Sequence, residues 1–161
     1  MSGASRAFDV AGALLLLALL GPPCLLAAAG VRVVLGPGVV FRQLRAGRDG
    51  VPFAVLKLRS LRHGPGDDAA RLTRFGHWLR ASALDEVPQL LNVLRGEMAL
   101  VGPRPLPLAY IPLYTAREAT RLRVRPGLCG LAQAAGRNAL AWDARLELDA
   151  RYVETRSLRG D

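Results

Sequence analysis

An uncharged segment near the N-terminus is the feature that most constrains this chain. From Val10 to Val31 no side chain is charged, and 22 residues are enough for a helix that crosses a bilayer. Pro22 and Pro23 lie in its middle, where each removes an amide donor and clashes with the preceding turn. A helix over residues 8–20 alone would cover only about 20 Å. We therefore expect a membrane-embedded re-entrant unit over residues 1–35, either a helical hairpin or a sharply bent helix.

Two other interpretations of this segment stay open. Arg6, the apolar stretch and the alanines at 27–29 imitate the three regions of a secretory signal peptide. An ordinary bent helix that spans the bilayer fits the same residues. Positive charge flanks both ends of the segment, which favours a cytoplasmic position for both. These flanking residues are Arg6 on one side and Arg42, Arg45 and Arg48 on the other.

Charge and hydrophobicity narrow the range of partners. The chain has 161 residues, a formal net charge of +9 and 51% hydrophobic residues. A basic and apolar protein of this kind suits an anionic membrane surface or a phosphate-rich ligand. Nucleic acid is not expected, because the arginines are scattered among aliphatic residues and no recognition motif is present. The length allows one catalytic or binding domain, over residues 36–161.

The residues after the apolar segment predict a β-hairpin followed by helices. Alternating residues flank Arg48-Asp49-Gly50, and Asp49-Gly50 supplies the backbone freedom of a tight turn. Alternation places Lys57 and Arg59 on one face of the second strand. Leu72, Phe75 and Leu79, with Trp78 and basic flanks, predict an amphipathic helix suited either to a headgroup layer or to the core. A further helix is expected from Trp142, giving an α/β fold with several short helices.

Asp85 and Glu86 are adjacent and precede a helix that Pro88 starts and Gly96 ends. The amides and macrodipole of a helix N-terminus favour negative charge, which should keep a carboxylate ionised. An ionised aspartate is what nucleophilic attack on a phosphoryl group requires. The alternative is structural: Ser82 and Asp85 have the spacing of a capping-box variant that would only stabilise the helix start.

Arg104 lies between Pro103 and Pro105, which restrict the backbone on both sides of it. A guanidinium held in this way can bind phosphate bidentately at a smaller entropic cost, although pairing with a surface acid is equally open. Further along, glycine-bearing turns at 127–130 and at 136 precede Arg137 and Asn138. Glycines let the backbone approach a ligand closely, so a second arginine could reach the same phosphate.

Residues 41–62, 72–106 and 124–153 resemble successive signature blocks of the bacterial sugar transferases, the monotopic polyprenyl-phosphate phosphoglycosyl transferases. The resemblance implies an enzyme of the bacterial inner membrane with its active site at the cytoplasmic face. It would transfer a sugar 1-phosphate from a UDP-sugar to polyprenyl (undecaprenyl) phosphate and release UMP. This is the first membrane step of exopolysaccharide synthesis. In that family the apolar segment is a re-entrant helix broken at a proline.

The resemblance also implies roles for individual residues. Asp85 would be the nucleophile that forms a phosphosugar intermediate, with Glu86 as its acidic partner and Lys57 paired with both. The substrate-binding residues would be Arg104, Arg137 and Arg59. The expected cofactor is Mg²⁺, held by the Asp85 carboxylate and the diphosphate; the cation and the arginines would offset charge as UMP leaves.

Some positions depart from the family pattern. Cys129 stands in place of threonine, Ala135 in place of asparagine, Leu61 in place of methionine and Gly21 in place of serine. The sequence ends at Asp161, where relatives generally continue, so weaker membrane docking is expected. Two alternatives follow: a catalytically silent membrane adaptor of the same fold, and a basic single-pass protein that binds anionic lipid.

Overall fold

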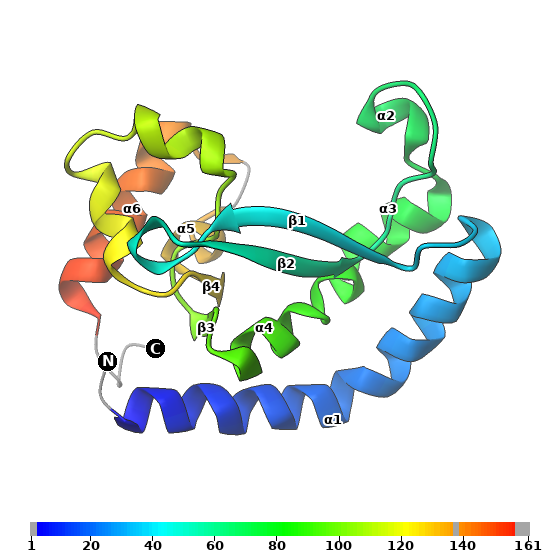
Figure 1. Cartoon of the computed structure of the whole chain (residues 1–161), viewed down its shortest axis with the longest axis horizontal. Coiled ribbons are helices and arrows are strands. Elements are labelled where there is room, and N and C mark those ends of the chain that lie inside the picture. Colours follow the sequence, from blue (N-terminus) through cyan, green and yellow to red (C-terminus); the bar gives the residue numbers. More distant parts are fainter. Residues whose placement is uncertain (1–2, 137–138, 157–161) are drawn as a thin grey trace.

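The computed structural model describes residues 3–136 and 139–156, and it has a mixed α/β fold (Figure 1). A long helix, α1, runs along one side, α4 lies on it, and an antiparallel hairpin lies on α4. The remaining elements gather at the two ends of the hairpin (Figure 1). The helices are α1 (Gly3–Val34), α2 (Asp68–Arg71), α3 (Arg74–Ala81), α4 (Gln89–Arg95), α5 (Leu131–Ala134) and α6 (Trp142–Thr155). The strands are β1 (Val40–Ala46), β2 (Pro52–Leu58), β3 (Ala99–Val101) and β4 (Gly127–Cys129).

The apolar segment forms one continuous bent helix, which corrects the prediction of a two-armed hairpin. Helix α1 continues through Pro22 and Pro23, and it changes direction along its length (Figure 1). Two consecutive prolines remove hydrogen bonds on one side of the helix, while their fixed φ remains compatible with helical geometry. A bent helix, the other form that the sequence analysis gave for this segment, is therefore the form that the structure takes.

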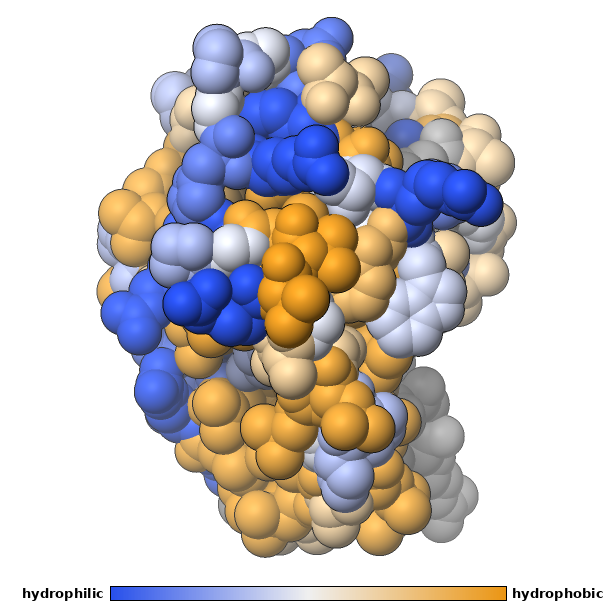
Figure 2. Space-filling model, turned by 90° about the vertical axis from the view of Figure 1, so that its right-hand side faces the viewer, coloured by the Kyte–Doolittle hydropathy of each residue, from blue (hydrophilic) through white to orange (hydrophobic). Residues whose placement is uncertain are grey.

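Most of the apolar surface of α1 is not covered by the rest of the chain. Residues 4–34 are long and apolar enough to cross a membrane, and only 11% of their most apolar window is buried. Figure 2 shows this apolar surface gathered at the level of α1, with charged residues above it. A bare apolar surface of this size is typical of contact with lipid. The large exposed side chains include Leu14, Leu15, Leu19, Leu25, Leu26 and Val33.

The N-terminal end of α1 is bound to the end of α4 and to β3. The Arg6 guanidinium donates to the carbonyl oxygens of Val93 (2.6 Å) and Leu94 (2.7 Å), where a cation offsets the negative end of the helix dipole. The buried Asp9 carboxylate accepts from the Leu100 amide at 2.9 Å. These contacts fix the start of α1 against the rest of the fold.

The C-terminal end of α1 packs against the same body. Val31 and Leu35 are buried in one cluster with Leu58 of β2 and Leu79 of α3. A methyl group at Gly30 would lie 2.7 Å from the Phe75 ring, so α3 approaches α1 closely here. Both ends of the apolar helix therefore contact one folded unit.

The predicted β-hairpin is confirmed. Strands β1 and β2 pair antiparallel, with Phe41 opposite Lys57 and Arg45 opposite Phe53. The turn at Arg48–Gly50 has positive φ at Asp49 (56°) and Gly50 (75°), which explains the Asp-Gly sequence. Because directly paired residues share a face, Gln43 and Arg45 lie on the face that carries Lys57.

The amphipathic helix is shorter than predicted. As its pattern indicates, some of its apolar side chains are buried and others are exposed. Helix α3 begins at Arg74, after Thr73, whose hydroxyl accepts from the Gly76 amide. Leu79 is fully buried, whereas Trp78 is about half exposed and stacks on Phe75 with ring centroids 5.6 Å apart. The helix therefore serves both the core and the surface.

A second sheet, absent from the sequence prediction, carries the proline-rich loop. Strands β3 and β4 pair in parallel. A methyl group at Gly127 would lie 2.1 Å from the Gly102 amide nitrogen, so the two backbones can meet only with glycine at this position. This contact fixes the start of the loop that contains Arg104.

Candidate active site

The two acidic residues lie on a short 3-10 turn, Leu84–Glu86, between α3 and α4. Ala83 has φ 57° and reverses the chain before the turn. The Ser82 hydroxyl donates to the Leu79 carbonyl, and α4 begins without a side-chain cap. The capping-box alternative is therefore wrong: Ser82 closes α3, and neither carboxylate caps α4.

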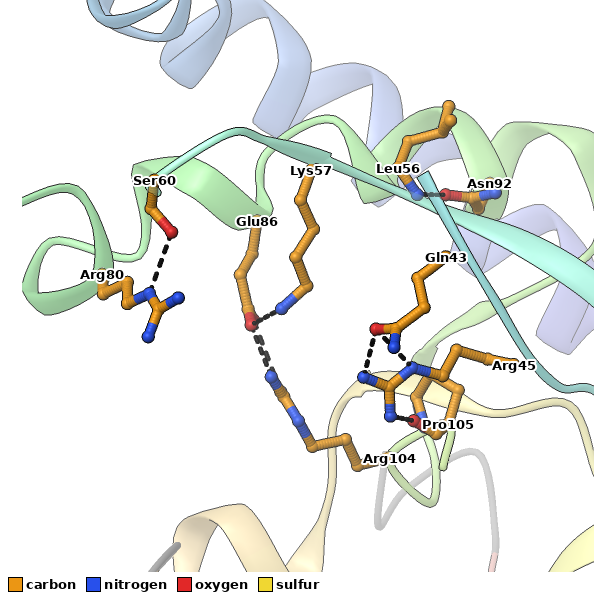
Figure 3. A network of polar contacts seen from close by, with 10 residues as sticks. All are labelled: Gln43, Arg45, Leu56, Lys57, Ser60, Arg80, Glu86, Asn92, Arg104 and Pro105. Atoms are coloured by element: carbon orange, nitrogen blue, oxygen red, sulfur yellow. Dashed lines mark hydrogen bonds and ion pairs between the residues drawn. The ribbon is translucent and has the colours of Figure 1, made fainter. Parts of the chain in front are cut away.

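Glu86 holds two cations from distant parts of the chain (Figure 3). Lys57 Nζ, from β2, donates to Glu86 Oε1 at 2.7 Å. Arg104 Nη2 and Nη1 reach Oε1 at 2.5 Å and Oε2 at 3.4 Å. The structure thus brings together Lys57, Glu86 and Arg104, three residues that the sequence analysis assigned to one site, and Arg104 pairs with an acid.

The two neighbouring carboxylates differ in their electrostatic surroundings. Burial alone would raise the pKa of Glu86, but the bonds and charges of Arg104 and Lys57 outweigh it and lower that pKa to about 2. Burial raises the pKa of Asp85, and Glu86 adds to this, while Lys57 and Arg80 act in the opposite direction. Arg104 and Lys57 are therefore the cations that keep Glu86 ionised.

Asp85 is the carboxylate left without a direct cation bond. Its side chain is buried, and within residues 3–136 and 139–156 no other side chain donates a hydrogen bond to it. Arg80 of α3, which donates to the Ser60 hydroxyl at 2.9 Å, lies near enough for its charge to act on Asp85. A buried, unpaired carboxylate beside several cations is poorly solvated and suited to attack on an electrophile.

Asn92 joins the strand that carries Lys57 to the helix that follows Glu86. This fully buried residue of α4 accepts from the Leu56 amide at 3.1 Å (Figure 3), and it donates to the Ala54 carbonyl at 2.8 Å. It therefore serves as a hydrogen-bonding partner for the free edge of β2. The sequence analysis missed it, although an asparagine among buried leucines and valines was a signal.

Replacing Asn92 by alanine is expected to lower the free energy of unfolding by about 2 kcal/mol, because the Leu56 amide and Ala54 carbonyl lose buried partners. Thermal unfolding in detergent measures this effect. Leu91→Ala, at an exposed position of the same helix, is the control and should change stability much less. Equal losses from the two variants would contradict the assigned role of Asn92.

The Arg104 loop is supported from behind by a buried ion pair. Arg121 Nη2 donates to the Arg104 carbonyl and to Asp149 Oδ2 of α6, each at 2.7 Å. Arg121 Nη1 also donates to the Tyr114 hydroxyl at 2.8 Å, and both charged side chains are about 95% buried. Helix α6 thus sets the position of the loop that presents Arg104.

Two predicted substrate-binding residues are not part of this cluster in the structure. Arg59 is buried at the end of α1, where its Nη2 donates to the carbonyls of Leu35 (2.7 Å) and Gly36 (2.8 Å). That contact caps the helix and does not place its guanidinium beside Glu86. Arg137 lies outside the described residues.

Gln43 and Arg45 of β1 also face the site, and the sequence analysis assigned them no role there. Figure 3 shows both beside Arg104, with Arg45 bonded to Gln43 and to the Pro105 carbonyl. The signal that could have found them is the alternation of β1, once it is paired with the alternation that selected Lys57.

The residues present fit Mg²⁺ in one specific manner. Among the described residues no group of three His, Cys, Asp or Glu side chains could hold a metal ion. Magnesium, however, often binds proteins through one or two carboxylates together with substrate phosphates. Asp85 offers one carboxylate without a direct cation bond, so binding with a diphosphate is chemically consistent.

A bare apolar helix, paired carboxylates and clustered cations are features of a membrane-associated enzyme with an anionic substrate. The model of the bacterial sugar transferase family matches residues 2–161. The chain belongs to this family and is an enzyme of the transferase class.

Individual relatives agree with the family assignment. The chain is 44% identical to the "Uncharacterized sugar transferase EpsL" of Bacillus subtilis, over 92% of this chain and 77% of that protein. It is also 44% identical to a Caulobacter vibrioides UDP-glucose:undecaprenyl-phosphate glucose-1-phosphate transferase, over 97% of this chain and 64% of that protein. It is 37% identical to the exopolysaccharide production protein ExoY of Rhizobium meliloti, over 98% of this chain and 80% of that protein.

Proposed function

We propose that this protein transfers a sugar 1-phosphate from a UDP-sugar to undecaprenyl phosphate and releases UMP, as a first membrane step of exopolysaccharide synthesis. The observation that carries the proposal is the buried Asp85 beside Glu86, which holds Lys57 and Arg104. The name of the Caulobacter relative, 44% identical, supports the same donor and acceptor classes.

The reaction proceeds in two displacements at one phosphorus atom. An Asp85 oxygen attacks the phosphorus that bears the sugar, and the bond to the UMP oxygen breaks with its electron pair on UMP. The acceptor phosphate then attacks the same phosphorus, and the bond to Asp85 breaks. Lys57 and Arg104 offset negative charge as the first bond breaks. Mg²⁺, held by Asp85 and the diphosphate, would supply further charge neutralisation.

The proposal is tested with the full chain in detergent, given undecaprenyl phosphate, Mg²⁺ and a panel of UDP-sugars. Release of UMP over many turnovers, which requires both the lipid and one particular donor, is the expected result. If folded protein releases no UMP from any donor, the proposal is overturned in favour of a silent adaptor.

We further propose that α1 lies in the inner membrane with both ends at the cytoplasmic face, as a re-entrant unit over residues 1–35. The contacts of both helix ends with one folded unit support this, because a spanning helix would separate its ends by the bilayer thickness. The catalytic unit, residues 36–161, would then lie on the cytoplasmic side, where UDP-sugars occur. The net charge of +9 favours an anionic membrane surface.

Cysteine labelling in closed vesicles is expected to find the two ends of the described chain on one side. Single cysteines at the exposed positions Ala4 and Arg156, in a background with Cys24→Ala and Cys129→Ser, should react equally with an impermeant maleimide. Labelling of the two positions from opposite sides would contradict re-entry.

A further inference from the structure

The proposed reaction gives no role to Arg45 and Gln43, which lie beside Arg104 (Figure 3). Arg45 Nη2 and Nε donate to Gln43 Oε1 at 2.6 and 3.1 Å, and Nη1 reaches the Pro105 carbonyl at 3.4 Å. The guanidinium is therefore held between β1 and the loop that carries Arg104 (Figure 3). Both contacts direct it toward the site.

Arg45 is a cation without a counter-ion. Within the described ranges it makes no bond to a carboxylate, and both of its acceptors are neutral oxygens. Burial lowers the pKa of Arg45, and the positive charge of the neighbouring Arg104 adds to this. A partly desolvated guanidinium beside a second cation is unfavourable until an anion binds.

The charges around Asp85 and Glu86 do not balance. Among the described residues, Lys57, Arg80 and Arg104 act on two carboxylates, Asp85 and Glu86, and Arg45 adds a fourth cation beside Arg104. Glu86 already accepts from two of the four cations. The excess positive charge is therefore concentrated where Arg45 and Arg104 approach each other, on the hairpin side of the site.

We infer that Arg45, oriented by Gln43, binds the diphosphate of the nucleotide donor together with Arg104. This inference rests on the proposed function, which supplies the nucleotide donor. Two guanidinium groups, one from β1 and one from the loop after β3, can bind the two phosphoryl groups of one diphosphate. In Figure 3 both arginines lie apart from α1, which favours the water-soluble donor over the phosphate of a lipid embedded beside that helix.

A purely structural role for Arg45 makes a different prediction. If the residue only ties β1 to the Pro105 loop, a carboxylate at position 43 would strengthen the tie and leave ligand binding unchanged. If Arg45 binds the donor, the same carboxylate would neutralise it and compete with the ligand. Gln43→Glu therefore separates the two roles, even if Arg45→Gln also weakens the fold.

The experiment measures binding of UDP by titration calorimetry to the full chain in detergent, for wild type, Arg45→Gln and Gln43→Glu. Arg42→Gln is the matched control, because it removes the same charge from the opposite face of β1. Both site variants are expected to raise the Kd for UDP by about tenfold, since each removes one charge-assisted interaction. The control should stay within about twofold, and the KM for undecaprenyl phosphate should not change.

UDP binding of wild-type strength in Gln43→Glu would overturn the inference in favour of the structural tie. A change confined to the KM for undecaprenyl phosphate would overturn it in favour of the acceptor. If wild type binds UDP through Arg45 but releases no UMP from any donor, the anion site is supported and the proposed reaction is refuted. A wild-type protein that binds no UDP would refute the inference itself.

Discussion

Replacing Asp85 by asparagine is expected to lower UMP release by at least about 10³-fold, because an amide cannot attack phosphorus as a carboxylate does. Single-turnover release of UMP from the productive donor is the measurement. Glu86→Gln keeps the proposed nucleophile, Asp85, but frees Lys57 and Arg104 from their shared partner, so a smaller loss of about 10–10²-fold is expected. Retention of UMP release in Asp85→Asn would contradict the proposed role of Asp85 and point to another nucleophile.

The same substitution should not damage the fold. Burial and Glu86 raise the pKa of Asp85, so the charged form is unfavourable in the folded protein, and a neutral amide relieves that penalty. The melting temperature of Asp85→Asn should therefore equal or exceed that of wild type. An inactive variant that is also strongly destabilised would contradict the assigned role, because lost structure would then explain lost activity.

The raised pKa of Asp85 also predicts how activity depends on pH. The acid limb of the kcat/KM profile should lie above pH 3.8, the ordinary pKa of aspartate, because the proposed nucleophile, Asp85, must be ionised to attack. Glu86→Gln should move this limb to lower pH, since it removes a neighbouring negative charge and frees Lys57 for Asp85. A shift in the opposite direction would indicate that a different group titrates.

Replacing Asp149 by alanine is expected to lower the melting temperature by on the order of 10 °C. Removal of one partner leaves the Arg121 charge buried and unpaired, a change that costs about 3–5 kcal/mol. Because Arg121 also donates to the Arg104 carbonyl, UMP release should fall more than unfolding alone explains. Thermal unfolding, and activity measured well below the transition, separate these two effects.

Helix α6 supplies the matched control. Glu147→Gln, on the same helix as Asp149, breaks an exposed ion pair between Glu147 and Arg117 and should change stability little. The double variant Arg121→Met/Asp149→Leu removes both buried charges and should recover part of the stability. It should not recover the hydrogen bond from position 121 to the Arg104 carbonyl. Equal effects of Asp149→Ala and Glu147→Gln would contradict the importance of burial at this site.

The sequence alone was sufficient for the elements whose signals are local. Alternation and the Asp-Gly turn predicted the hairpin, and Pro88 and Gly96 bracket α4 as expected. Family signature blocks marked Lys57, Glu86 and Arg104, which the structure brings together. Such signals act over a few residues, so they can be read without knowing what packs against them.

Only the tertiary structure decided how these elements hold the site. The Asn92 bonds to β2, the Arg121–Asp149 pair behind Arg104, and the meeting of Gly102 with Gly127 all join residues far apart in sequence. The same holds for Arg59, which shares the alternation of Lys57 but binds the end of α1. A local pattern gives the face on which a side chain lies; the free energy of packing and buried pairing selects its partner.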